Sequence, residues 1–147
     1  MMAWLIFFHL VGATIWTGGH LILATRILPE ALRKRDPAIL KAFEEPFEKI
    51  GIPALLVQTI TGLLLAGHYL NHWWYAFRFE TPMHTWIAWK LMFLGATILI
   101  AAHARIRLIT RLKEENLGYL AAHIIVITLL SIAFLVLGTT LRMGGWS

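Results

Sequence analysis

The chain has 147 residues, of which 59% are hydrophobic and 14% are charged, and its formal net charge is +5. Soluble domains carry about 25% charged residues, so this composition excludes an ordinary soluble domain and indicates a membrane protein. Disulfides and thiolate ligands are excluded because cysteine is absent. The basic residues lie mostly between apolar runs, where they act as topology signals, so the positive charge does not indicate a nucleic-acid partner.

Four apolar runs are each long enough to cross a bilayer, since about 20 helical residues span its hydrocarbon core. Only one of them holds a formal charge in its interior, which is Lys90. The runs occupy most of the chain and leave no room for a separate soluble domain. We therefore predict one all-α domain over residues 1–147, an integral membrane four-helix bundle, with helices at about 3–28, 52–70, 83–104 and 117–141.

A charged segment between the first two predicted spans carries an amphipathic pattern over residues 37–50. Asp36 and Pro37 are typical of the N-cap and first position of a helix. Apolar residues then recur every three to four positions, which predicts a helix lying at the membrane surface that leads into the second span. Pro53 is expected to kink this junction.

Basic residues predict the orientation of the bundle. Ten Lys and Arg residues lie in the connections between helices one and two and between helices three and four, whereas the other loop and the tails hold only Arg78 and Arg142. The positive-inside rule places the two basic connections in the cytoplasm and both termini outside. We expect a multi-pass protein of the inner (plasma) membrane.

Histidines inside the predicted spans are the strongest functional signal, because an ionisable side chain is costly in a bilayer. His9 and His20 share a face of the first helix, three turns and about 16 Å apart. With the predicted topology, His9 and His68 lie in the outer half of the membrane. The inner half holds His20, His103 and His123. His72 and His84 lie at or beyond helix ends, where interfacial roles are expected.

Neutral imidazole is the usual axial ligand of haem b, and helix bundles hold cofactors between inward-facing side chains. We predict an outer haem bound by His9 with His68. We predict an inner haem bound by His20 with either His103 or His123, and the sequence leaves that choice open. Copper is the alternative metal, although Cu(I) sites favour Met and Cys ligands.

Four basic side chains are candidates to pair with haem propionates. Lys90 and Arg142 are placed near the outer layer, and Arg26 and Arg105 near the inner one. The arginines are equally explained as snorkelling topology residues. Lys90 lies about seven residues inside its helix, so we expect an anionic partner for it.

Three stretches resemble known membrane families. The pattern His9-x-x-Gly12-x-x-x-Trp16-x-x-Gly19 followed by Arg26 resembles the first helix of the HemJ and CopD-like families. Lys90-Leu91 with His103 further along resembles their third helix. The segment RDPAILKAFEEPFEKIGIPALLVQTITGL is similar to the CopD-type connection into a second helix that contains Thr-Gly.

The resemblance implies two different activities. HemJ-like proteins are four-helix protoporphyrinogen oxidases that bind haem b, which implies functional roles for His9 and Lys90. CopD-like proteins are associated with copper uptake or resistance. The chain departs from the HemJ-like pattern where an Asn-Glu-x-Pro element leads into the fourth helix, since it reads ENLGYLAAH there. His20 and His123 also lie outside that pattern, which favours a second ligand layer and a second haem.

These observations together predict a b-type cytochrome with two haems, which carries out electron transfer or redox chemistry in the membrane. Its redox partner would be a quinone, a tetrapyrrole or another small redox substrate, in contact with membrane lipids. Pairing of chains through small-residue helix faces is a further expectation. The alternatives are a HemJ-like oxidase with one haem, a CopD-like copper protein without haem, and a structural subunit of a larger complex.

Overall fold

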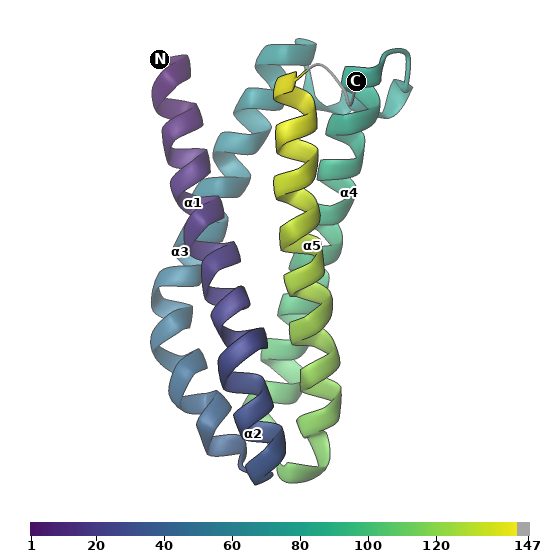
Figure 1. The fold of residues 1–147 in the computed structure, drawn as a ribbon. Coiled ribbons are helices and arrows are strands. Elements are labelled where there is room, and N and C mark those ends of the chain that lie inside the picture. Colours follow the sequence, from purple (N-terminus) through teal and green to yellow (C-terminus); the bar gives the residue numbers. More distant parts are fainter. Residues whose placement is uncertain (144–147) are drawn as a thin grey trace.

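The structure is a computed structural model that describes residues 1–143 of the chain. It contains four long helical segments, of which each runs antiparallel to the next, and residues 1–143 form no β-strand (Figure 1). Each segment is long and apolar enough to cross a membrane. The predicted all-α four-helix bundle is therefore confirmed, and these features make the protein a multi-pass membrane protein.

The first segment is longer than its predicted limits. Helix α1 (Met2–Ile22) continues through a π-helical turn, η1 (Leu23–Ile27), into α2 (Leu28–Lys34). Pro29 was expected to follow the helix end, but it lies within this continuous segment, directly after the π-helical turn, whose wider spacing accommodates a residue without an N–H. The segment ends at Arg35, whose φ of 53° is the left-handed conformation that commonly closes helices.

Helix α3 (Pro37–Leu70) joins the predicted surface helix and the second span into one element. Its 34 residues correspond to about 51 Å, well beyond the thickness of the hydrocarbon core. The Asp36 side chain caps it by accepting a hydrogen bond from the Ala38 N–H. Pro46 and Pro53 lie inside the helix without ending it.

A short 3-10 helix, η2 (Trp73–Arg78), connects α3 to α4 (Pro82–His103). Helix α4 continues through a second π-helical turn, η3 (Ala104–Leu108), and a 3-10 turn, η4 (Ile109–Arg111). Another 3-10 turn, η5 (Glu114–Asn116), leads into α5 (Leu117–Met143).

The four segments do not pack equally against one another. Helix α1 packs closely along α3, α4 packs against α5, and α1 also contacts α5, whereas α3 and α4 contact each other at few points. Gly12 explains the closeness of α1 and α3, because a Cβ atom there would lie 2.7 Å from the Ala54 carbonyl oxygen. Few contacts therefore hold α3 against α4.

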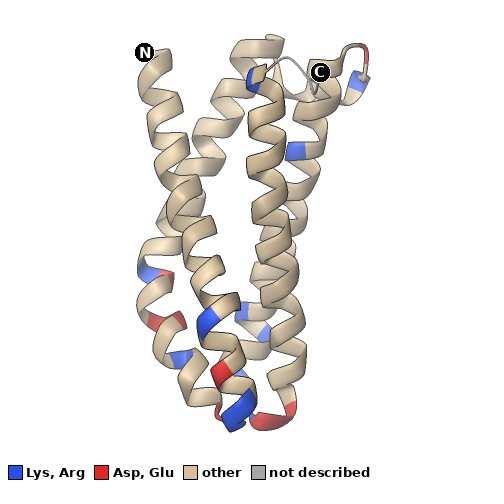
Figure 2. Ribbon diagram, viewed as in Figure 1, with Lys and Arg blue, Asp and Glu red and all other residues tan. Residues whose placement is uncertain are grey.

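Charged residues gather at one end of the bundle, which we call the charged end, and the N-terminus and Met143 lie at the opposite end (Figures 1 and 2). Buried apolar residues from α2, α3, η3, η4 and α5 form a core cluster at the charged end. A second cluster, built by α3, η2 and α4, lies at the opposite end. The positive-inside rule predicts that the charged end faces the cytoplasm.

Candidate functional site

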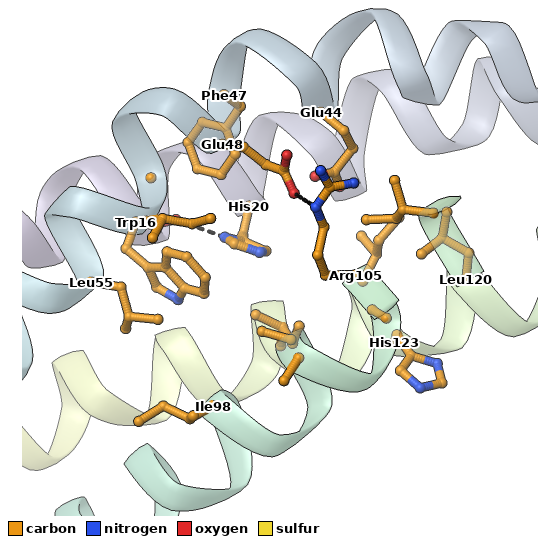
Figure 3. A pocket seen from close by; sticks show the side chains of 18 residues that line it. Trp16, His20, Glu44, Phe47, Glu48, Leu55, Ile98, Arg105, Leu120 and His123 are labelled. Atoms are coloured by element: carbon orange, nitrogen blue, oxygen red, sulfur yellow. Dashed lines mark hydrogen bonds and ion pairs between the residues drawn. The ribbon is translucent and has the colours of Figure 1, made fainter. Parts of the chain in front are cut away.

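Side chains from all four helical segments line a cavity of about 250 Å³ near the charged end (Figure 3). Helix α1 contributes Trp16 and His20, and α3 contributes Phe47. Ile98 from α4 and Ile124 from α5 close the other walls. The lining is mainly apolar, so any polar group that faces this space has few partners available.

A hydrogen bond within its own helix fixes the tautomer of the neutral His20 ring. Its side chain is buried, and its Nδ1 donates a hydrogen bond of 2.9 Å to the Trp16 carbonyl oxygen. A carbonyl oxygen can only accept, so in the neutral imidazole the proton is on Nδ1 and Nε2 carries the lone pair. The Trp16 ring packs on the imidazole at a centroid distance of 4.4 Å, and the Phe47 ring approaches edge-on at 5.6 Å.

Trp16 supplies an unused hydrogen-bond donor to the same cavity. Its side chain is only 6% exposed, and its indole Nε1 has no hydrogen-bond partner within residues 1–143. The indole forms part of the cavity wall beside His20 (Figure 3). Buried donors without a partner are uncommon in folded proteins and usually indicate a missing water, ion or ligand.

An ion pair closes the cavity toward the charged end. Arg105 Nε, in the π-helical turn η3, lies 2.6 Å from Glu48 Oε1 of α3. The Glu44 side chain lines the cavity next to this pair (Figure 3). The pair joins two elements that otherwise contact each other little, and Arg105, a predicted propionate partner, is bound here to a carboxylate of the protein itself.

His123 reaches the cavity of His20, whereas His103 does not line it. His123 Nδ1 donates to the Tyr119 carbonyl oxygen at 2.8 Å, and its Nε2 lies 2.9 Å from His103 Nδ1. His123 Nε2 therefore accepts this second bond from His103. Figure 3 shows the His123 ring at the edge of the cavity, turned away from His20. The structure thus brings His20 and His123 to one space without placing them face to face.

A second group of polar side chains lies closer to the opposite end of the bundle. His9 Nδ1 donates to the Gln58 carbonyl oxygen at 3.0 Å and lies 3.1 Å from Thr61 Oγ1, which leaves Nε2 with its lone pair. The imidazole lies over Gly62, where a Cβ atom would come within 3.0 Å of it. Close approach at a glycine therefore positions this ring.

Lys90 of α4 is near enough for its charge to act on His9. Its ammonium lies beside Gly138 of α5, where a Cβ atom would be 3.5 Å from Nζ. Within residues 1–143 no hydrogen bond or ion pair is made by this ammonium. The buried Gln58 Oε1 also lacks a hydrogen-bond partner in the described part of the chain.

The remaining predicted ligands lie elsewhere. His68 is exposed with its ring against Tyr69, two turns and about 10 Å further along α3 than Thr61, and no contact joins it to His9 within residues 1–143. Arg26 and Arg142 are exposed and do not line the cavity. No group of three or more His, Cys, Asp or Glu residues suited to a metal ion is found among the described residues.

Three residues of the cavity were not predicted, namely Trp16 as a donor and the pair Glu44 and Glu48. Trp16 lies four residues before His20, so helical spacing placed both on one face. The two glutamates are four residues apart, which places both on one face of α3. Their position opposite Arg105 depends on how α3 packs against its neighbours. No family model, curated protein or solved structure matches the chain, so the HemJ-like and CopD-like resemblance stays a prediction.

Proposed function

We propose that this protein is a b-type cytochrome of the plasma membrane that transfers electrons within the bilayer, with its charged end in the cytoplasm. One observation carries the proposal. Two histidines inside the spans, His9 and His20, each donate Nδ1–H to a main-chain carbonyl. This second bond fixes the tautomer and ring orientation of a metal-binding imidazole and leaves Nε2 for the metal.

The side chains around His9 support the haem proposal. The His9 Nε2 lone pair would hold the iron, while Gln58 and Thr61 keep the ring oriented. The Lys90 ammonium would pair with a propionate, which would supply the anion that a cation inside a span requires. When bound, the haem supplies an iron that gains and loses one electron at a time. His68 would need to turn inward to serve as the second axial ligand.

A second haem on His20 and His123 is the dihaem form of the same proposal, and it has weaker support. The cavity of about 250 Å³ lies just below the roughly 300–1,000 Å³ of typical small-molecule sites, so it suits a single ring better than a macrocycle. His123 Nε2 is engaged by His103, and Arg105 is paired with Glu48. A macrocycle there would have to displace both contacts and separate α3 from α4.

An absorption spectrum of the purified protein, oxidised and then reduced with dithionite, tests the proposal. We expect a Soret band and reduced b-type bands, and the haem-to-protein ratio gives the number of haems. His9→Ala should abolish haem binding, whereas the matched control His84→Ala should retain it, because His84 hydrogen-bonds Thr81 at the start of α4. The absence of a Soret band from folded protein produced with excess haem would overturn the proposal.

A HemJ-like porphyrinogen oxidase is the second candidate, and the position of Lys90 favours it. An ammonium without an ion pair in the described residues, close to His9, could bind a carboxylate of a tetrapyrrole substrate as readily as a haem propionate. Oxidation of protoporphyrinogen by the purified protein with an added quinone as electron acceptor, followed by porphyrin fluorescence, distinguishes the two. Lys90→Met should abolish this oxidation and spare the haem spectrum if the lysine binds substrate.

A CopD-like copper protein remains the alternative without haem. Elemental analysis of the same preparation would detect copper. Copper in stoichiometric amount together with no Soret band would favour this alternative over both haem candidates.

A further inference from the structure

The cavity at the charged end has a chemical character that the haem proposal leaves unexplained. An indole donor, Trp16 Nε1, and an imidazole acceptor, His20 Nε2, belong to two rings that pack against each other at 4.4 Å. The donor is buried and has no partner within residues 1–143. A ligand that fills this space therefore needs an oxygen that accepts from the indole, and it gains a further bond if that oxygen also carries a proton.

The cavity opens toward the lipid. Ile52 of α3 and Ile98 of α4 both line it, and their side chains are 48% and 42% exposed. They belong to two helices that contact each other at few points, and both helices are apolar enough to span a membrane. A ligand can enter sideways between α3 and α4, which selects a molecule that is dissolved in the bilayer.

The charges at the polar end select a neutral head group. Two carboxylates, Glu44 and Glu48, line the cavity together with one guanidinium, Arg105, which already pairs with Glu48. Because this guanidinium is already paired, a further carboxylate, such as that of a fatty acid or a haem propionate, would find no free Lys or Arg side chain on the cavity wall. The flanking Trp16 and Phe47 rings favour a flat head.

We propose that this cavity binds the head of a membrane quinone. A ring carbonyl accepts a hydrogen bond from Trp16 Nε1, and in the reduced form the corresponding hydroxyl also donates to His20 Nε2. The isoprenoid tail leaves between Ile52 and Ile98 into the lipid. The inference deepens the proposed function by giving the electron carrier its membrane partner, and it assigns the cavity to a quinone in place of a second haem.

Binding of a short-chain quinone, decylubiquinone, to the purified full-length protein tests the assignment. Trp16→Phe keeps the ring and removes the donor, so we expect roughly fivefold to tenfold weaker binding, as for one buried hydrogen bond. The matched control is Trp89→Phe, an exposed tryptophan of α4 that does not line the cavity and should bind like the wild type. Equal affinity of the wild type and Trp16→Phe would overturn the proposal.

Ala101→Leu gives a second variant that fills the cavity and leaves Trp16 intact. We expect it to lose quinone binding while it keeps the helical circular dichroism spectrum of the wild type. Retained binding in this folded variant would contradict the assignment, as would equally tight competition by oleate. Two haems per chain, with one lost in His20→Ala, would also overturn it.

The two proposals fail separately because they have separate readouts. Quinone binding with no Soret band would refute the cytochrome and support the quinone site. One haem per chain with no quinone binding would support the cytochrome and refute the site. One haem together with quinone binding that depends on Trp16 supports both.

Discussion

His20 donates its Nδ1 proton to the carbonyl oxygen of Trp16 at 2.9 Å, and the Trp16 indole next to it keeps an unused donor. One turn of α1 thus presents an acceptor nitrogen and a donor nitrogen to the same apolar cavity. The arrangement is built by local helix geometry, since a side chain at position i reaches the carbonyl at i−4. Its chemical meaning comes from the walls that α3, α4 and α5 add around it.

The orientation of the bundle can be measured directly because the chain has no cysteine. Glu80 lies in the loop between α3 and α4, and Arg111 lies at the charged end, so we choose the single variants Glu80→Cys and Arg111→Cys. We expect a membrane-impermeant maleimide added to intact spheroplasts to label Glu80→Cys at once and Arg111→Cys only after permeabilisation. The reverse pattern would show that the positive-inside prediction is wrong for this protein.

Gly12 should be intolerant of any side chain. In Gly12→Ala the new methyl would lie 2.7 Å from the Ala54 carbonyl oxygen, so α1 must move away from α3. We expect a loss of about 1–3 kcal/mol in the free energy of unfolding, as for other overpacked sites. Thermal unfolding in detergent checks this, with Gly18→Ala as the control on the same helix, where a Cβ atom meets no atom within 4 Å. Equal stability of the two variants would contradict the predicted α1–α3 contact.

The ion pair of Glu48 and Arg105 should contribute modestly to stability. The Arg105 side chain is 49% exposed, so solvent screening limits the contribution of the pair to about 1 kcal/mol or less. A double-mutant cycle with Glu48→Gln and Arg105→Gln isolates this coupling from other effects of each change. Additive losses in thermal unfolding would mean that the two residues do not interact. A positive coupling would support the pair as the contact that holds α3 against η3.

Lys90 should destabilise the protein in the absence of a ligand. Its ammonium has no ion pair within residues 1–143 and lies inside a span, so replacing it with an apolar side chain of similar length removes an uncompensated charge. We expect Lys90→Met to unfold at a higher temperature than the wild type when haem is absent, and to gain less from added haem. An unchanged response to haem would mean that Lys90 pairs with no haem propionate.

Apolar runs and basic connections were enough to predict four antiparallel helices, because the bilayer requires each span to satisfy its own backbone hydrogen bonds. The limits of the elements were harder to predict. Pro29 suggested a helix end, yet it lies within a continuous helical segment, directly after the π-helical turn η1. Proline restricts only one turn, and the packing of neighbouring residues decides whether the helix continues.

Sequence alone determined which histidines lie inside the spans, and local helix geometry set the bond of His20 to the Trp16 carbonyl. Only the tertiary structure decided which of them share a space. It placed His123 at the cavity and kept His103 off its wall, although both lie near the charged end. It also left His68 exposed and put His9 within range of the Lys90 charge. The reason is physical: helical periodicity gives the direction of a side chain on its own helix, whereas the rotation and separation of neighbouring helices depend on side-chain packing, as at Gly12 against Ala54.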